Sequence, residues 1–516
     1  MARYKDYDYS QTKLIPISFS QQILPGTFEY TLSYLVDHEL DLSIFAHRYC
    51  NDETGAPAYD PALLLKIVLY AYSRGITSSR LIERGCRENV IFMALSADTQ
   101  PHFTTIAHFI STMEGDITAL FRDVLLYCDE LGLIGKEMFA IDGCKLPSNA
   151  SKEWSGTKAD FERKKKKLEG AVRRMLKTHH ERDRREANAE VIEQEQQYIQ
   201  TLKGQIKKIK AWLDDNDDKP GKTGKPKKSN LTDNDSAKMK TSHGVIQGYD
   251  GVAAVDAKHQ IIVHAQAFGE AQEHDLLQPM IDGARENFQT IDKNKDIFDQ
   301  AKLTADAGFH SEANMRYLQE EKIDGYVADN LFRKRDPRFA DVDKYKQRHR
   351  EERRQYQGNQ SLYSPSDFNH DPDQQTCTCP AGQSLYRNGS NVNINGRLGV
   401  KYTAPKRACL PCPLRAKCLR HPERTEVRQV VFFKDRSQSS KETFTAKMKR
   451  KIDSAIGKTI YSLRVGTVEP VFGNLTYNKG LRRFSLRGKS KVDTQWKLFC
   501  LVHNIGKIHR YGEGFS

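Results

Sequence analysis

Three acidic residues occupy positions from which they could do chemistry. The run Met138–Ile141 is predicted to be a short buried strand that ends at Asp142. A second short strand, Lys302–Ala305, is predicted to end at Asp306 in the same way. Open α/β sheets gather reactive groups at the ends of their strands, so both carboxylates are candidates for one crevice. Taken singly, either aspartate is more simply explained as an ordinary turn or helix cap.

Glu469 is the third candidate. The segment Thr467–Leu475 is predicted to begin a helix, with Thr467 as its cap and Pro470 in its first turn. Lys and Arg far outnumber Asp and Glu in the surrounding residues 458–510. A carboxylate in so basic a segment suggests a metal ligand held against bound phosphate. The alternative is an acid at a helix N-terminus, stabilised by the helix dipole.

Grouping three acids has an electrostatic requirement. Carboxylates a few ångströms apart repel one another, and each raises the pKa of the other, unless a cation lies between them. Oxygen ligands select Mg²⁺ or Mn²⁺ over Zn²⁺. A pair of such ions activates the attacking oxygen and stabilises the leaving oxygen of an in-line phosphoryl transfer. If the three acids converge, we therefore expect metal-dependent phosphoryl transfer without a covalent enzyme intermediate.

A second group of chemically capable residues is rich in cysteine. The chain has 10 cysteines, and five of them fall between Cys377 and Cys418. Cys409 and Cys412, together with Cys379 and Cys418, fit a tetrahedral structural zinc site. Cys377 is a spare or a substitute ligand. Reduced cysteines without a metal are the alternative.

Composition limits the class of partner. The chain has 516 residues, a net charge of +14 and a pI near 9.1, which favours a polyanion such as nucleic acid. An anionic membrane surface is compatible with the charge alone. However, the longest apolar run, Leu63–Tyr70, is interrupted by Lys66 and is too short to span a bilayer. The polar N-terminus lacks a signal core, so we expect a cytoplasmic protein with no membrane partner.

The N-terminal region is predicted to be helical, because apolar residues recur every three or four positions over residues 61–133. The turn at residues 74–78 precedes a helix expected from Ser79, and a later helix carries Thr105 and His108. This pattern is compatible with a helix-turn-helix that reads DNA. A purely structural helical bundle accounts for it equally well.

Strand signals between residues 245 and 328 alternate with helical segments and predict a mixed sheet, hence an α/β core. Residues 252–255 and 260–265 are predicted to form an antiparallel hairpin. Before them, residues 158–228 are dominated by charge and are predicted to be helical at first and then a flexible linker. A solvated helical hairpin explains this stretch better than a dedicated DNA-binding device does.

Four segments together resemble a bacterial insertion-sequence transposase with a DDE catalytic triad, of the insertion-sequence group numbered 1182. They begin FAIDGCKLPSN, TSHGVIQGYDGVAAVD, KLTADAGFHS and TVEPVFGNLTYNKG. The likeness extends from YDPALLLKIVLYAYSRG almost to the C-terminus. It implies an RNase H-like core in which Asp142, Asp306 and Glu469 form the metal-binding triad. It also implies that the N-terminal helical domain binds the terminal inverted repeats of the element.

Basic residues around Glu469 are predicted to bind the phosphates of DNA. The candidates are Arg464, Lys479, Arg482, Arg483, Arg487 and Lys489. Some relatives place Tyr, Arg and Lys at fixed intervals around the glutamate, and Tyr461 and Arg464 keep the first interval. The intervals from Arg464 to Glu469 and from Glu469 to Lys479 are longer than in those relatives. Trp496 is expected to pack in the core rather than to stack on a base.

The expected protein is a multi-domain α/β transposase. Its predicted parts are a helical DNA-binding domain at 1–135, a first core part at 136–330 with a charged insertion at about 158–230, a Cys-rich insertion at 331–457, and the last core part at 458–516. The resemblance implies cleavage of transposon ends and strand transfer into target DNA with Mg²⁺ or Mn²⁺, by a homodimer in the bacterial cytoplasm, associated with the nucleoid. An RNase H-like nuclease, or a catalytically inactive DNA-binding regulator derived from a transposase, is the alternative.

Overall fold

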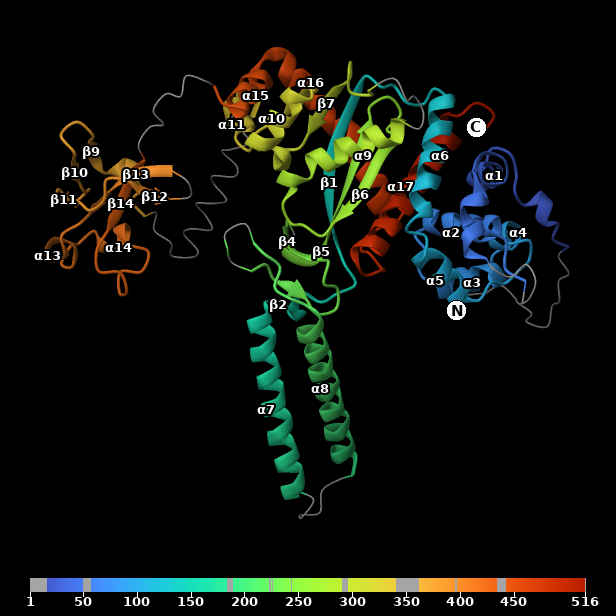
Figure 1. Ribbon diagram of the computed structural model, residues 1–516, viewed down its shortest axis with the longest axis horizontal. Coiled ribbons are helices and arrows are strands. Elements are labelled where there is room, and N and C mark those ends of the chain that lie inside the picture. Colours follow the sequence, from blue (N-terminus) through green and yellow to red (C-terminus); the bar gives the residue numbers. More distant parts are fainter. Residues whose placement is uncertain are drawn as a thin grey trace, which may run out of the picture. The chain divides into compact units, whose positions relative to one another are not determined.

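A mixed sheet of six strands lies at the centre of the larger part of the chain (Figure 1). The computed structural model describes residues 16–49, 57–182, 189–221, 224, 226–242, 244–289, 296–339, 362–394, 397–433 and 442–515. The chain divides into two compact units, one of Met1–Asp329 with Met448–Ser516 and one of Asn330–Lys447.

The strands of the central sheet are β1 (Met138–Pro147), β4 (Ala237–Thr241), β5 (Gly244–Asp256), β6 (Ile262–Phe268), β7 (Lys302–Ala305) and β8 (Asp324–Val327). Their order is β4-β5-β1-β7-β8, and β6 pairs with β5. β1 runs parallel to β7 and antiparallel to β5, and β7 runs parallel to β8. The predicted mixed sheet is thereby confirmed, and β5 with β6 forms the predicted hairpin.

β1 is longer than its sequence pattern indicates. The pattern predicts an end at Asp142, but the strand continues antiparallel to β5 as far as Pro147. The residues after Asp142 stay in the strand because β5 is long enough to satisfy their backbone hydrogen bonds. Only the parallel ladder with β7 ends there, since its last pair is Ile141 with Ala305. Both candidate aspartates therefore follow the last pair of one parallel ladder.

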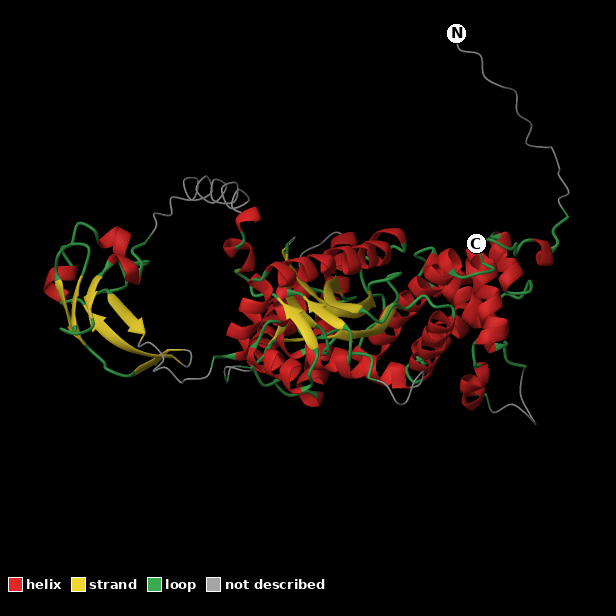
Figure 2. Cartoon of the chain, turned by 90° about the horizontal axis from the view of Figure 1, so that it is seen from above, coloured by secondary structure: helices red, strands yellow, loops and turns green. Residues whose placement is uncertain are grey.

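Helices cover both faces of this sheet (Figure 2). The helices of the core are α9 (Leu277–Gln289), α10 (Glu312–Glu320), α16 (Ala455–Gly473) and α17 (Lys489–Tyr511), and α15 (Phe444–Asp453) precedes α16. Gly251 of β5 lies against Trp496 of α17, and His264 of β6 lies against Gly283 of α9. His264 of β6 is paired with Ala254 of β5 and lies on the same face of the sheet as Ala254. Ala254 is three residues from Gly251, so these two β5 residues face opposite sides of the sheet. α17 and α9 therefore cover opposite faces. Among the described residues, no helix combines the length and the apolar character needed to cross a membrane.

α16 is much longer than predicted. The sequence pattern predicts a start at Thr467, with Glu469 at the helix opening. Instead the helix begins after Ser454, whose side chain caps it. Glu469 therefore lies near the C-terminal end of a helix, where the dipole disfavours an acid. The alternative explanation of Glu469 as an acid at a helix N-terminus is wrong.

Pro470 is tolerated inside α16 because another side chain replaces the hydrogen bond that a proline cannot make. Proline has no N–H to donate to the carbonyl four residues earlier. That carbonyl belongs to Gly466, and Gln260 Nε2 donates to it at 3.0 Å. Gln260 lies in the turn between β5 and β6, so the same bond attaches α16 to the sheet.

The N-terminal residues form the predicted helical region. Its helices are α1 (Phe28–Tyr34), α2 (Pro61–Ser73), α3 (Ser79–Glu88), α4 (Val90–Leu95), α5 (Phe103–Ser111) and α6 (Asp116–Glu130), with the helical turns η1 (Phe19–Gln21), η2 (Leu35–Glu39) and η3 (Leu42–Arg48). α17 contacts α1, α2, α5 and α6 as well as β6. Because one helix packs against both, the helical region and the sheet belong to the same compact unit.

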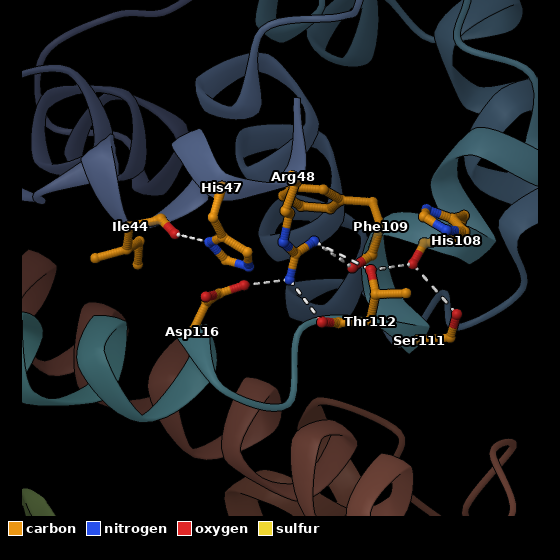
Figure 3. A network of polar contacts seen from close by, with 8 residues as sticks. All are labelled: Ile44, His47, Arg48, His108, Phe109, Ser111, Thr112 and Asp116. Carbon is orange, nitrogen blue, oxygen red and sulfur yellow. Dashed lines mark hydrogen bonds and ion pairs between the residues drawn. The ribbon is translucent and has the colours of Figure 1, made fainter. Parts of the chain in front are cut away.

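Arg48 forms hydrogen bonds and an ion pair at the junction of α5 and α6 (Figure 3). Its guanidinium donates to the carbonyl oxygens of Phe109 and Thr112, at 3.3 and 2.8 Å, where α5 ends. It also pairs with the buried carboxylate of Asp116 at the start of α6. One side chain thus satisfies C-terminal carbonyls of one helix and an acid on the next, which fixes the angle between them.

The charged stretch forms a helical hairpin of α7 (Lys158–Arg182) and α8 (Ala189–Asp215), which lie side by side in Figure 1. The short strands β2 (Ser155–Gly156) and β3 (Ser229–Asn230) pair at its base, after the turn η4 (Lys152–Trp154). An apolar seam joins the helices through Phe161, Val172, Ile199, Leu202, Ile209 and Trp212. In this seam Ile199 is buried, whereas the adjacent Tyr198 is 55% exposed.

The second unit has its own antiparallel sheet, ordered β12-β13-β11-β10-β9 with β14 beside β13. Its strands are β9 (Asn369–Asp371), β10 (Thr376–Thr378), β11 (Ser384–Arg387), β12 (Val392–Ile394), β13 (Arg397–Thr403) and β14 (Gln429–Phe433). Its short helical elements are α11 (Phe332–Arg335), η7 (Pro337–Phe339), η8 (Pro365–Asp367), α13 (Lys406–Cys409) and α14 (Arg415–Cys418). A small core of its own surrounds Tyr402 and Cys377.

Trp496 is among the largest fully buried side chains, and its indole N–H donates to the Val252 carbonyl at 3.0 Å. The expected packing role is confirmed. We predict that Trp496→Ala lowers the free energy of unfolding by about 3–5 kcal/mol, because it leaves a cavity and a buried carbonyl without its donor. Urea unfolding measures the change. Tyr477→Ala, at a side chain that is 81% exposed, is the control and should cost less than about 0.5 kcal/mol. Equal unfolding midpoints for the two variants would contradict this role.

Candidate active site

The parallel pairing of β1 with β7 places Asp142 and Asp306 side by side at one edge of the sheet. The Arg464 side chain of α16 lies between them. Its Nη1 pairs with Asp142 Oδ2, and its Nη2 is 3.3 Å from Asp306 Oδ1. Two of the three predicted acids are therefore brought together, and a guanidinium bridges them.

Burial and mutual repulsion set the charge of this pair. Burial raises the pKa of Asp142 to about 6, and the negative charge of Asp306 adds to the shift. The Arg464 guanidinium and the backbone N–H of Gly143 oppose the rise, because both stabilise the ionised carboxylate. Burial likewise raises the pKa of Tyr461 to about 12, so this phenol stays neutral beside the arginine.

Glu469 lies on the same helix as Arg464, a little more than one turn further on, and is exposed. The pKa of Cys144 on β1 is raised to about 12, first by burial and also by the charges of Asp250, Asp142 and Glu469. Glu469 thus acts electrostatically on the strand that carries Asp142. Its side chain does not join the ion pair of Arg464 in the part of the chain that the structure describes.

The donor set at this edge suits a hard divalent cation, since it consists of carboxylate oxygens. Asp142 and Asp306 are already adjacent and already require a positive charge between them, which Arg464 supplies. Across the described ranges, no three His, Cys, Asp or Glu side chains are yet arranged to hold a metal ion. A metal at this position would therefore replace the guanidinium as the cation between the two carboxylates.

A second acidic cluster, which the sequence patterns do not reveal, lies beside the first. Lys145 Nζ is 2.8 Å from Oε1 of Glu273, which lies in η5 (Glu273–Asp275) just before α9. Asp250, opposite Lys145 on β5, is fully buried, and neither of its carboxylate oxygens has a hydrogen-bond partner in the described structure. Burial, and then the charge of Glu273, raise the pKa of Asp250 to about 8.

Two glycines leave room for this cluster. A Cβ atom at Gly143 would lie 2.7 Å from Asp250 Oδ1, and one at Gly308, in η6 (Ala307–Phe309), would collide with Glu273 Oε2. Each glycine follows a candidate aspartate within two residues. The Asp-Gly and Asp-Ala-Gly patterns were the signal that could have indicated additional acids close to Asp142 and Asp306.

The predicted zinc ligands lie together in the second unit. Cys379, Cys409, Cys412 and Cys418 all line one cavity of about 30 Å³. Burial raises the pKa of Cys418, Arg428 opposes the rise, and the other three thiols add to it. Cys377 is instead buried in the core of this unit. Cys379 therefore lines this cavity, and Cys377 does not.

The predicted DNA-binding cations fall into three environments. Arg482, Arg483 and Arg487 are exposed on the segment between η9 (Asn474–Asn478) and α17, and Lys489 is exposed at the first residue of α17. Two of them are oriented by Asn149, which accepts from Arg483 Nη2 at 3.0 Å and from Arg487 Nε at 2.8 Å. Lys479 is partly buried at the end of η9, and Arg464 is buried against the carboxylates.

The predicted helix-turn-helix elements are present in the N-terminal region. α2 ends at Ser73 and α3 begins at Ser79, so residues 74–78 form the connecting turn. α5 carries Thr105, which is partly buried, and His108, which is exposed. His108 is labelled in Figure 3. This geometry is compatible with either a DNA reader or a structural bundle.

Two family models match parts of the chain. One, described as a transposase DDE domain, matches residues 378–509, and the other, described as a transposase domain (DUF772), matches residues 17–112. The first match contains Glu469 and the four cysteines of the cavity. The two aspartates lie outside both matches. A search of curated proteins finds no match. Together the two matches support a DNA transposase of the insertion-sequence DDE type.

Arg464→Met should destabilise the protein more at high pH than at low pH. The pKa of Asp142 is higher in the folded chain, about 6, than its ordinary value of 3.8. Ionised Asp142 therefore opposes folding, and this penalty is absent below pH 3.8 and fully present above about pH 6. Without Arg464 the penalty grows, so we expect a loss of about 3–5 kcal/mol at pH 8.

Urea unfolding of parent and Arg464→Met at pH 4 and pH 8 measures this difference. Arg482→Met, at an exposed arginine, is the matched control and should change stability by less than about 0.5 kcal/mol at either pH. A loss for Arg464→Met that is the same at both pH values would show that the arginine does not serve as the counter-cation of Asp142.

Proposed function

We propose that this protein is a DDE transposase that cleaves DNA at transposon ends and transfers the freed strand to target DNA. The observation that carries the proposal is the convergence at one sheet edge of Asp142 and Asp306, with the helix of Glu469 packed against both strands. The matches to transposase domains support the same reaction class. We also propose that the chain belongs to the insertion-sequence group numbered 1182, from the order of its four segments.

In this proposal Asp142 and Asp306 would hold Mg²⁺ or Mn²⁺, with Glu469 as the third ligand. A bound divalent metal supplies charge stabilisation for the attacking and leaving oxygens of phosphoryl transfer. Arg464 pairs with both carboxylates in the described structure. With a divalent ion between the carboxylates instead, its guanidinium would be available to a DNA phosphate. The predicted role of Arg464 in phosphate binding would thus follow metal binding.

The reaction would occur in two phosphoryl transfers. In the first, a water oxygen would form a P–O bond at the transposon end as the P–O3′ bond breaks, which frees a 3′-hydroxyl and leaves the phosphate on the 5′ end. That hydroxyl then attacks a phosphodiester of the target DNA, so that one P–O bond forms as another breaks. No side chain is needed as a nucleophile in either step, which agrees with a site built from carboxylates and arginine.

The DNA itself would be held outside the carboxylate pair. The exposed Arg482, Arg483, Arg487 and Lys489 would contact backbone phosphates. The N-terminal helices would bind the terminal inverted repeats. Because two ends must be brought together, we expect a homodimer on DNA.

One observation favours a second candidate, a DNA-binding regulator derived from a transposase but catalytically inactive. Arg464 already supplies the positive charge that the two aspartates need, and the described acids do not yet surround a metal position. Metal-dependent cleavage of an end oligonucleotide separates the regulator from an enzyme. A strand-joining assay then separates the transposase from an RNase H-like nuclease that only cuts.

We predict that Asp142→Asn and Asp306→Asn each abolish metal-dependent end cleavage, with a loss of at least about 100-fold, because each removes a charged metal ligand. Affinity for end DNA should stay within about twofold of the parent, since neither residue is proposed to contact a phosphate directly. Cleavage rates and electrophoretic mobility shifts measure the two properties. Glu320→Gln, an exposed acid on α10, is the control and should keep full cleavage. Undiminished cleavage by either aspartate variant would remove that residue from the mechanism.

We further propose that Cys379, Cys409, Cys412 and Cys418 hold a structural zinc ion. Their convergence on one cavity supports this, as does the preference of thiolates for Zn²⁺. The thiols would have to turn toward the centre of the cavity, which is large enough for a single ion. Such a site would stabilise the second unit, whose own apolar core is small.

The purified chain should then contain one zinc per molecule. Cys409→Ser should lose this zinc, whereas Cys377→Ser, at a cysteine in the core of the same unit, should retain it. Elemental analysis measures the metal, and the visible spectrum after Co²⁺ substitution reports thiolate ligation. Zinc retained by Cys409→Ser, or lost by Cys377→Ser alone, would contradict this ligand set.

A further inference from the structure

A cavity of about 340 Å³ lies between the C-terminal half of α16, η9 and the last turns of α17. Its walls include three cations, Lys479, Lys507 and Arg510, and the amides of Asn474 and Asn478. Pro470, the residue after Glu469, also lines it. Of the described residues that form the walls, none is acidic.

Two of these cations are partly buried without a compensating charge. Burial lowers the pKa of Lys479 to about 8, and the neighbouring Arg74 lowers it further. Burial and Arg510 likewise lower the pKa of Lys507. Lys507 Nζ is 2.9 Å from Gln260 Oε1, but neither lysine forms an ion pair with an acid within the described part of the chain.

Lys479 is held in place by neutral neighbours. Its ammonium lies 5.6 Å from the centre of the Phe28 ring of α1. Its backbone carbonyl lies against Gly75, in the turn between α2 and α3, where a Cβ atom would approach it to 3.1 Å. Gly75 has φ +74°, a conformation that favours glycine. The close approach brings Arg74 toward Lys479 and adds a fourth cation to the group.

The remaining titratable group in the cavity does not offset this charge. His503 is fully buried, and burial lowers its pKa to about 3, so the ring is neutral. Its Nε2 lies 2.9 Å from the Gln260 carbonyl and must donate to it. Its Nδ1 therefore accepts from Asn474 Nδ2 at 2.9 Å. The histidine orients the Asn474 amide and contributes no charge of its own.

Gathering cations in a partly buried cavity costs free energy unless an anion occupies it. We propose that this cavity binds a backbone phosphate of DNA, through Lys479, Lys507 and Arg510. The assignment rests on the proposed function, which supplies DNA as the anion. It adds Lys507 and Arg510 to the binding residues and gives Lys479 a defined site.

The position of the cavity suits a DNA strand that passes the carboxylate edge. Pro470, which lines the cavity, follows Glu469 directly in α16, so the cavity and the proposed third ligand belong to the same part of that helix. Arg74 lies near Lys479 and belongs to the turn of the predicted helix-turn-helix. A phosphate in the cavity would therefore link the N-terminal helices to the core.

The test compares DNA affinity with stability in the full-length chain. Lys479→Met and Lys507→Met remove one charge each and keep most of the side-chain volume. If a phosphate occupies the cavity, each variant should bind a generic duplex at least roughly threefold more weakly at about 50 mM salt, and its log-log salt slope should fall by about 0.9. Without DNA, each variant should be as stable as the parent or more stable, because a costly partly buried charge is gone.

Binding is measured in buffer with EDTA, so that the result does not depend on cleavage. Lys302→Met, at an exposed lysine at the start of β7, is the matched control and should keep the parent slope. Lys507→Arg, which restores the charge, should recover most of the lost affinity. Loss of stability in the methionine variants with an unchanged salt slope would overturn the proposal and show that the lysines are structural.

A second experiment measures the stability of the parent and of Lys479→Met with and without inorganic phosphate. Phosphate at millimolar concentration could stabilise the parent but not Lys479→Met, while the two proteins show equal salt slopes in DNA binding. That result would show that the cavity binds a free anion, and it would contradict the assignment to DNA. If the parent binds no DNA under any of these conditions, the proposed function fails together with this inference. If the parent binds DNA and the variants match it, only the inference fails.

Discussion

The repulsion between two aspartates on neighbouring parallel strands is the constraint on which the rest of the site depends. Asp142 and Asp306 are adjacent because β1 pairs with β7, and Asp142 is largely buried. Such a pair needs a cation, and α16 delivers one in Arg464. Gln260, in the turn between β5 and β6, attaches the same helix to the sheet by donating to the carbonyl that Pro470 leaves without a donor.

The sequence predicted the elements with strong local signals. The short runs before Asp142 and Asp306 were correctly predicted to be strands of a mixed sheet. Their direct parallel pairing is seen only in the fold. The end of β1 was not predictable, because the residues after Asp142 remain in the strand only through their pairing with β5. The start of α16 was misplaced for a related reason. Thr467 and Pro470 look like a helix beginning, and the residue that makes Pro470 acceptable lies 206 positions from Gly466 in the chain.

The remaining differences concern charges that meet only in the folded chain. Arg464 was expected to face phosphate, and it contacts carboxylates instead. The cluster of Asp250, Glu273 and Lys145 follows no motif, since its members come from separate elements. The cysteine cluster was visible in the sequence because its density is local, and four of its members, including Cys379, line one cavity, whereas Cys377 lies in the core. Local patterns thus indicate which side chains lie near one another in a short segment, whereas tertiary contacts decide which charges neutralise one another.

The late position of α16 and α17 in the chain governs when the carboxylate site can form. Asp142 and Arg464 are 322 residues apart, and the whole second unit is synthesised between β8 and α16. α17 then packs against both the sheet and the N-terminal helices. Contacts this distant form slowly, because long loops must close first. A growing polypeptide on the ribosome would therefore carry the two aspartates without their counter-cation until α16 has been synthesised.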